Sequence, residues 1–93
     1  MRADIYIREA YTCMKKQYGD DKLIPFHTGK YFEAYYDDAL KISTVSGLRT
    51  FGRTSEQVPT IRFAAEELVF YQTLLLDAGL FFCIPEQTYR KTL

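Results

Sequence analysis

Tryptophan is absent from the 93 residues, and cysteine, proline and histidine are scarce, with two, three and one of each. The two cysteines, Cys13 and Cys83, lie far apart, and neither has another Cys or a His beside it at metal-ligand spacing. This spacing provides neither a zinc motif nor a disulfide framework. We therefore expect two buried free thiols, no metal site and no other cofactor.

Neither sign of charge predominates, because 12 Lys and Arg residues balance 12 Asp and Glu residues. A neutral chain is not expected to coat DNA regardless of its sequence, so any contact with nucleic acid must be local. No apolar run approaches the roughly 18 residues that a membrane span requires. The N-terminus is charged at Arg2, Asp4, Arg8 and Glu9. These absences favour a soluble, cytoplasmic protein that makes no membrane contact.

Aromatic side chains are abundant, with eight Tyr and seven Phe residues. A chain of this length is close to the common size of one domain, and it buries roughly two-thirds of its unfolded surface. The aromatic residues must then supply much of a single core. We expect residues 1–93 to form one domain.

Three segments have the composition and periodicity of helices. In residues 4–18 the apolar side chains recur at steps of three and four, which predicts an amphipathic helix. A short helix is predicted over residues 38–46, with Asp37 or Asp38 as its N-cap. Residues 65–78 predict a third helix, which their apolar content suggests is well buried.

Strands are predicted between and after these helices. Residues 23–26 favour an edge strand because they include a proline, and residues 29–36 are rich in aromatic residues. Residues 48–51 and 58–63 predict a hairpin, and the apolar run at 80–84 predicts an interior strand. The whole pattern predicts an α/β domain of the α+β type, with a mixed sheet of about five strands flanked by three helices.

A dense aromatic motif lies at residues 24–39, where the sequence reads IPFHTGKYFEAYYDDA. This motif resembles the N-terminal mismatch-recognition domain (domain I) of the MutS DNA mismatch repair family, whose pattern is close to LFFRMGDFYELFYDDA. Val58-Pro59 and the run GLFFCIPEQ at residues 79–87 match further family features, so the resemblance covers nearly the whole chain. It implies a MutS domain I-like fold and contact with mismatched or distorted duplex DNA.

In that family the aromatic residue of a Phe-x-Glu motif wedges beside a mismatched base from the minor groove, and the Glu hydrogen-bonds to the base. Tyr31 and Glu33 occupy the matching positions, so the resemblance implies that both contact DNA. Insertion of a ring costs least where base pairing is already defective. From the residues alone, Tyr31 is predicted to be an ordinary sheet residue, and the alternative for Glu33 is a solvated strand carboxylate.

Basic residues in or beside the predicted loops are the candidate phosphate contacts: Lys30, Arg49, Arg53 and Arg62. His27 stands where the family has Arg and would bind phosphate when protonated, with a structural role as the alternative. Adjacent strand residues point to opposite faces, so Phe32 is expected to be buried and Glu33 to share a face with Tyr31.

No catalytic site is predicted. The 93 residues contain no G-x-x-x-x-G-K-[ST] loop for ATP, and they stop where the family continues into connector, lever, clamp and ATPase domains. The sequence therefore predicts a stand-alone, non-catalytic DNA-binding domain, with a protein partner to supply the missing domains. The alternative is a protein-interaction domain that keeps the fold without recognising DNA.

Overall fold

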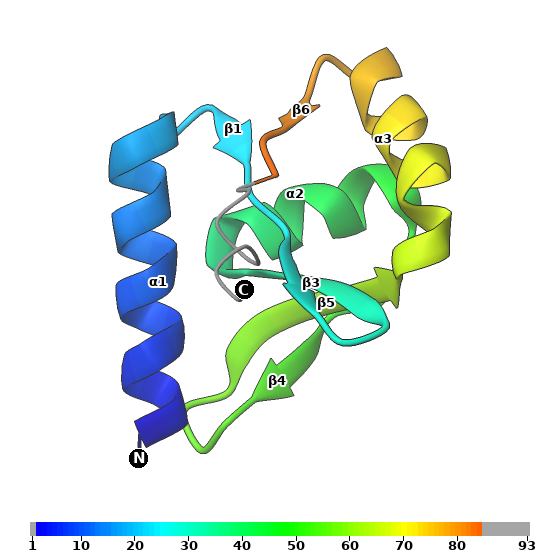
Figure 1. The fold of residues 1–93 in the computed structure, drawn as a ribbon. Helices are drawn as coiled ribbons and strands as arrows, with labels where there is room; N and C mark the ends of the chain where they lie inside the picture. The colour runs from blue at the N-terminus through cyan, green and yellow to red at the C-terminus, as the bar shows by residue number, and fades with distance from the viewer. Residues whose placement is uncertain (1, 85–93) are drawn as a thin grey trace.

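A computed structural model describes residues 2–84 of the chain, with side chains from residue 6 onward. The helical elements, in chain order, are α1 (Arg2–Tyr18), α2 (Tyr36–Ser46), the short 3-10 helix η1 (Ala65–Glu67) and α3 (Leu68–Asp77) (Figure 1). The strands are β1 (Lys22–Leu23), β2 (Phe26–Thr28), β3 (Tyr31–Tyr35), β4 (Phe51–Arg53), β5 (Val58–Ala64) and β6 (Phe81–Phe82). The predicted α/β class and the three predicted helices are confirmed.

The strands divide between two sheets. Strands β2, β3, β5 and β4 pair antiparallel in that order, whereas β1 and β6 form a separate parallel pair. The predicted hairpin is present as β4 and β5, but its first strand begins at Phe51, where the predicted strand of residues 48–51 ends, and the connecting turn is shortened to residues 54–57. In this turn the backbone N–H of Gln57 donates to the carbonyl of Thr54 at 3.0 Å, and both residues have positive φ.

One face of the four-stranded sheet carries the core. Phe32 and Ala34 on β3 lie opposite Phe63 and Ile61 on β5, and all four side chains are buried. Helices α2 and α3 lie on this side of the sheet in Figure 1, and the core residues Ile42 and Leu75 come from these two helices. Because strand residues alternate, the neighbours of the core residues point to the opposite face.

A buried ion pair attaches α1 to the rest of the fold. The ammonium of Lys15 donates to Asp38 Oδ1 at 2.8 Å and also to the carbonyl of Lys22. The other Asp38 oxygen accepts the backbone N–H of Ile24 at 3.0 Å. This pair links α1, α2 and the segment between β1 and β2, which are far apart in the sequence.

The prediction that Asp37 or Asp38 caps α2 is wrong. The N-cap position is Tyr35, and no side chain makes a capping hydrogen bond there. Asp38 is 14 residues from Ile24, but its carboxylate faces inward and bonds to that backbone instead. The second acidic residue of the motif therefore has a long-range structural role.

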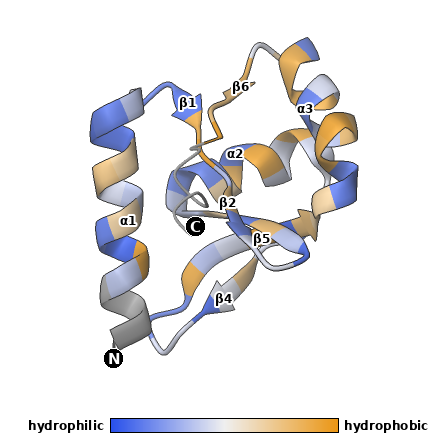
Figure 2. Ribbon diagram, viewed as in Figure 1, coloured by the Kyte–Doolittle hydropathy of each residue, from blue (hydrophilic) through white to orange (hydrophobic). Residues whose placement is uncertain are grey.

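Helix α3 is less buried than the sequence predicts. Its apolar residues are not confined to one side, as Figure 2 shows, and Val69 is 71 % exposed while Leu75 is fully buried. Phe70 and Leu76 are also exposed. Because apolar residues occur all around α3, the sequence does not indicate which side is buried, and packing against Phe63 and α2 decides it.

Two further expectations near the C-terminus and in α1 are wrong. The run at residues 80–84 forms the two-residue strand β6, which pairs with β1 outside the main sheet and leaves Phe81 exposed. Cys13 is exposed and Cys83 is half-buried, so neither is the buried thiol expected. Residues 85–87 of the run matched to the family, and the rest of the C-terminal tail, lie outside the described residues.

Among the described residues, no helix is both long and apolar enough to cross a membrane.

We expect Asp38→Ala to lower the free energy of unfolding by about 3–5 kcal/mol, because it leaves the Lys15 ammonium buried without its anion. The exposed neighbour Asp37 provides the control, and Asp37→Ala should cost less than about 1 kcal/mol. Urea denaturation of both variants measures the difference. Equal costs for the two substitutions would contradict the structural role of Asp38.

Candidate nucleic-acid interface

We call the sheet face opposite the core the open face. It brings aromatic and basic side chains together. Tyr31 and Glu33 extend from β3, and Arg62 on β5 lies directly opposite Glu33 in the register. Phe51 and Arg53 extend from β4, on the other side of β5. Tyr31 is 42 % exposed and Phe51 is 39 % exposed, so this face presents two rings to solvent.

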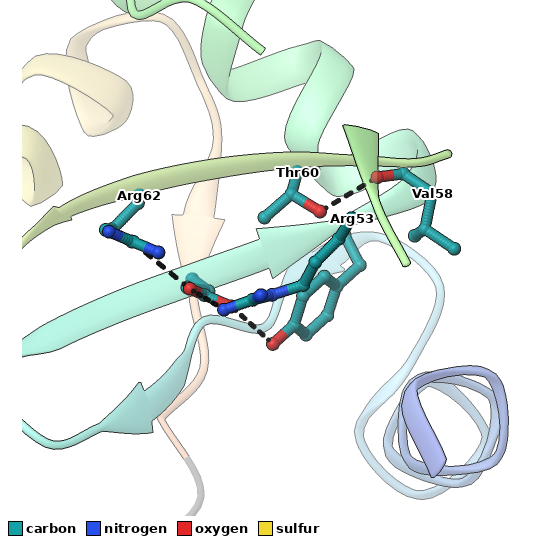
Figure 3. A network of polar contacts seen from close by, with 6 residues as sticks. Arg53, Val58, Thr60 and Arg62 are labelled. Atoms are coloured by element: carbon teal, nitrogen blue, oxygen red, sulfur yellow. Dashed lines mark hydrogen bonds and ion pairs between the residues drawn. The ribbon is translucent and has the colours of Figure 1, made fainter. Parts of the chain in front are cut away.

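Glu33 lies beneath this surface, only 1 % exposed. Arg53 forms a two-pronged ion pair with it, through Nε to Oε1 at 3.0 Å and Nη2 to Oε2 at 2.7 Å. Arg62 Nε donates to Oε2 at 3.2 Å, and the Tyr35 hydroxyl donates to Oε1 at 2.9 Å. Figure 3 shows the Arg53 and Arg62 side chains converging on this point. Both carboxylate oxygens are therefore engaged within the protein.

The charges of this network keep Glu33 ionised. Burial by itself would raise the pKa of the Glu33 carboxyl, but the hydrogen bonds from Arg53 and Tyr35 and the Arg53 charge bring it below the usual value. Burial and the adjacent carboxylate raise the pKa of the Tyr35 hydroxyl, which stays protonated as a donor. Two guanidinium groups share one carboxylate, so the network as a whole is positive.

Arg62 also contacts both exposed rings. Its guanidinium carbon lies 4.9 Å from the centroid of the Tyr31 ring and 5.5 Å from that of the Phe51 ring. Cation–π attraction of this kind is worth about 0.5–1 kcal/mol at an exposed site. The bond to Glu33 uses the Nε proton, which leaves the terminal N–H groups of Arg62 as donors for a ligand.

A depression of about 350 Å³ adjoins the Tyr31 ring. Its lining includes Lys30, Ala64, Ala65 and Glu66, which come from the β2–β3 turn and from the junction of β5 with η1. The backbone N–H of Ala65 donates to the carbonyl of Lys30 at 2.8 Å and joins the two segments. The charged residues Lys30 and Glu66 thus both line a hollow next to Tyr31.

The structure separates the candidate contact residues into two groups. The first is Tyr31 with Glu33, Arg53 and Arg62, with Lys30 next to Tyr31.

The second group lies elsewhere. His27 pairs with Phe32 in the register and stacks on its ring at 4.7 Å, which places it on the opposite sheet face from Tyr31. Arg49 is exposed in the loop between α2 and β4. The expectations that Phe32 is buried and that Glu33 shares a face with Tyr31 are confirmed.

Phe51 is the residue of this face that the sequence did not identify. It was assigned to a strand, but strand membership alone does not say which strand it joins or which face it occupies. A weak signal existed, because Phe51 and Arg53 are two positions apart and must share a face. Pairing of Phe51 with Thr60 on β5 places it beside Arg62.

The comparison with known families decides the relationship of this chain. The model of MutS domain I matches residues 7–92. The chain belongs to the MutS domain I family. This match confirms the resemblance that the motifs at residues 24–39, 58–59 and 79–87 indicated over nearly the whole chain. No curated protein matches the chain.

MutS domain I is a DNA-recognition domain of a mismatch repair family and is not itself catalytic. Membership therefore gives this domain a DNA-binding context. Within residues 2–84, no group of three His, Cys, Asp or Glu side chains is placed to hold a metal ion.

Replacement of Glu33 by Gln should lower the free energy of unfolding by about 1.5–3 kcal/mol at pH 7, because it removes charge-assisted hydrogen bonds. The pKa of Glu33 is lower in the folded state than in the unfolded state. Its contribution to stability is therefore complete at a pH above the unfolded-state pKa, and it disappears as the pH falls through the folded-state pKa. The difference between wild type and Glu33→Gln should therefore shrink from about pH 5 downward.

Denaturation curves between pH 3 and pH 7 test this dependence. The matched control is Glu66→Gln, which neutralises an exposed carboxylate on the neighbouring η1 and should have little effect at either pH. A stability difference for Glu33→Gln that does not change with pH would mean that the carboxylate charge has no stabilising role.

Proposed function

We propose that this chain is a non-catalytic, cytoplasmic DNA-binding domain that contacts mismatched or distorted duplex DNA through its open sheet face. The observation that carries the proposal is the position of Tyr31. Its ring is exposed at the wedge position of the family motif, and the Arg62 guanidinium lies against it. A stackable ring beside a cation suits a base step and its phosphates.

Tyr31 is proposed to insert beside a base where pairing is already weakened. The ring is placed on β3 of a packed sheet, and the neighbouring Phe32 is anchored in the core. A rigid strand holds a wedge in a fixed direction better than a loop does. The tyrosine hydroxyl requires a polar partner, which phosphate or water at a groove can supply.

Glu33 is proposed to act mainly through the arginines. A direct hydrogen bond from its carboxylate to a base would require Arg53 or Arg62 to move, because both oxygens are already bonded. In its observed position the carboxylate holds two guanidinium groups against the sheet. Pre-ordered arginines lose less conformational freedom when they bind phosphate.

Lys30, Arg53 and Arg62 are the proposed phosphate contacts on this face. Lys30 lies in the turn beside Tyr31, and the two arginines flank Glu33. Arg49 and His27 are proposed as peripheral contacts, since they lie away from this cluster. The whole set is small, which suits a domain that binds weakly by itself.

A second candidate function is protein interaction, which the exposed apolar residues of α3 favour. Val69, Phe70 and Leu76 present hydrophobic surface that the described part of the chain leaves in contact with solvent. Such surface often marks contact with another protein. The two functions are compatible, because α3 lies on the opposite side of the sheet from Tyr31.

We expect Tyr31→Ala to weaken binding to mismatched duplex by about 1–3 kcal/mol through lost stacking. The fold should stay intact, because Tyr31 lies outside the core at 42 % exposed and its contact with the Arg62 guanidinium is worth about 0.5–1 kcal/mol. Tyr31→Phe should keep the affinity, since it retains the ring. Fluorescence anisotropy with labelled duplexes measures binding, and thermal melting measures stability.

The control for these variants is Tyr6→Ala, which removes an exposed tyrosine of α1. It should change neither binding nor stability appreciably. If Tyr31→Ala and Tyr6→Ala bind mismatched DNA equally well, Tyr31 is not a wedge, and protein interaction becomes the better candidate function.

The salt dependence of binding should be shallow. Lys30, Arg53 and Arg62 bring three positive charges to the face and Glu33 removes one, so the slope of log affinity against log salt should be about −2. Titrations between 25 and 200 mM KCl measure it. Lys30→Gln should reduce the slope by about one unit, and a slope of zero would remove the electrostatic part of the proposal.

A further inference from the structure

The open face has two exposed rings, whereas a wedge requires one. Tyr31 and Phe51 extend from strands that lie on either side of β5, and the Arg62 guanidinium on β5 lies between them. The row therefore crosses three adjacent strands in the order ring, guanidinium, ring. We call Tyr31, Arg62 and Phe51 the stacking row.

Duplex DNA does not explain the second ring. The faces of paired bases are covered by their neighbours, so each inserted ring must unstack a base step at a cost of a few kcal/mol. A single-stranded segment has no such cost, because its base faces are already free. Two rings on one sheet surface are thus better matched to unpaired bases than to a helix.

Arg62 provides the polar group that such a strand needs between two bases. Its Nε bond to the buried Glu33 fixes the guanidinium against the sheet, and its terminal N–H groups remain donors. Between two stacked bases the backbone carries a phosphate, and a planar guanidinium can bind two phosphate oxygens at once. Arg53 continues the positive surface on the Phe51 strand.

We propose that the stacking row binds single-stranded nucleic acid, with one base on Tyr31, another on Phe51 and the phosphate between them on Arg62. This inference rests on the proposed function in one respect, namely that nucleic acid occupies the open face. It adds Phe51 as a binding residue, places the phosphate contact of Arg62 between two stacked bases, and names unpaired nucleotides as the preferred ligand.

The test measures anisotropy of a labelled oligothymidine and of a labelled mismatched duplex at low salt, with the whole chain. Phe51→Ala should weaken oligothymidine binding roughly tenfold, in line with the loss of one stacked base. The loss for the mismatched duplex should be much smaller. Phe70→Ala is the control, because it removes another exposed phenylalanine, 63 % accessible against 39 % for Phe51, from α3 on the far side of the sheet.

Arg62→Lys separates position from charge. The lysine keeps the positive charge but cannot hold the planar contact with both rings and Glu33, so oligothymidine binding should weaken while the salt slope is unchanged. Thermal melting of each variant confirms that the protein is folded at the assay temperature. An oligouridine of the same length shows whether the strand is read as DNA or RNA, since the stacking chemistry is shared.

Any one of three results would overturn the inference. The wild-type protein could bind oligothymidine no more tightly than perfect duplex. Phe51→Ala could lose no more affinity for oligothymidine than Phe70→Ala does, or folded Arg62→Lys could keep the wild-type affinity. The proposed function would survive any of these if Tyr31→Ala still weakens mismatched duplex binding. Conversely, Phe51→Ala could weaken oligothymidine binding while Tyr31→Ala leaves the affinity for mismatched duplex unchanged. This result would support the stacking row and contradict the proposal that Tyr31 is a wedge.

Discussion

The open face of this domain depends on one buried carboxylate. Glu33 lies under the surface of β3, and its two oxygens receive donors from Arg53, Arg62 and Tyr35. A buried anion is tolerated only when it is paired and hydrogen-bonded, so the arginines have little freedom to leave. Their fixed position in turn sets the contacts of Arg62 with the two exposed rings. A chain with no net charge thereby concentrates positive charge and aromatic surface in one place.

The family motif contains a second buried carboxylate, and it anchors the scaffold behind this face. Asp38 joins α1 and the β1–β2 segment to α2 through Lys15 and the backbone of Ile24. Glu33 and Asp38, five positions apart in the motif, thus accept hydrogen bonds from donors that are distant in the sequence. The physical reason is the same for both, because a carboxylate accepts several hydrogen bonds and can join separate segments. The motif encodes the scaffold as well as the proposed contact with DNA.

The alternation of strand residues separates the packing surface from the proposed binding surface. Phe32 and Phe63 point toward α2 and α3, whereas Tyr31 and Arg62, each adjacent to one of them in sequence, point away. The proposed wedge, Tyr31, is held by the buried Phe32 next to it and is itself 42 % exposed. The same alternation explains why His27, although it belongs to the motif, stacks on Phe32 on the core side of β2 and lies apart from the main group of proposed contacts.

The sequence by itself determined the family, the α/β class, the helix at residues 4–18 and the opposite orientations of Tyr31 and Phe32, because these depend on local periodicity and on a dense motif. Only the tertiary structure decided which side of the apolar helix α3 is covered and that the last strand pairs with β1 outside the main sheet. It also decided that Arg53 and Arg62, 20 and 29 residues beyond Glu33, meet at that carboxylate. Local periodicity specifies the face of a residue within its own strand, but the partner across the sheet is set by strand order and register, which long-range pairing determines.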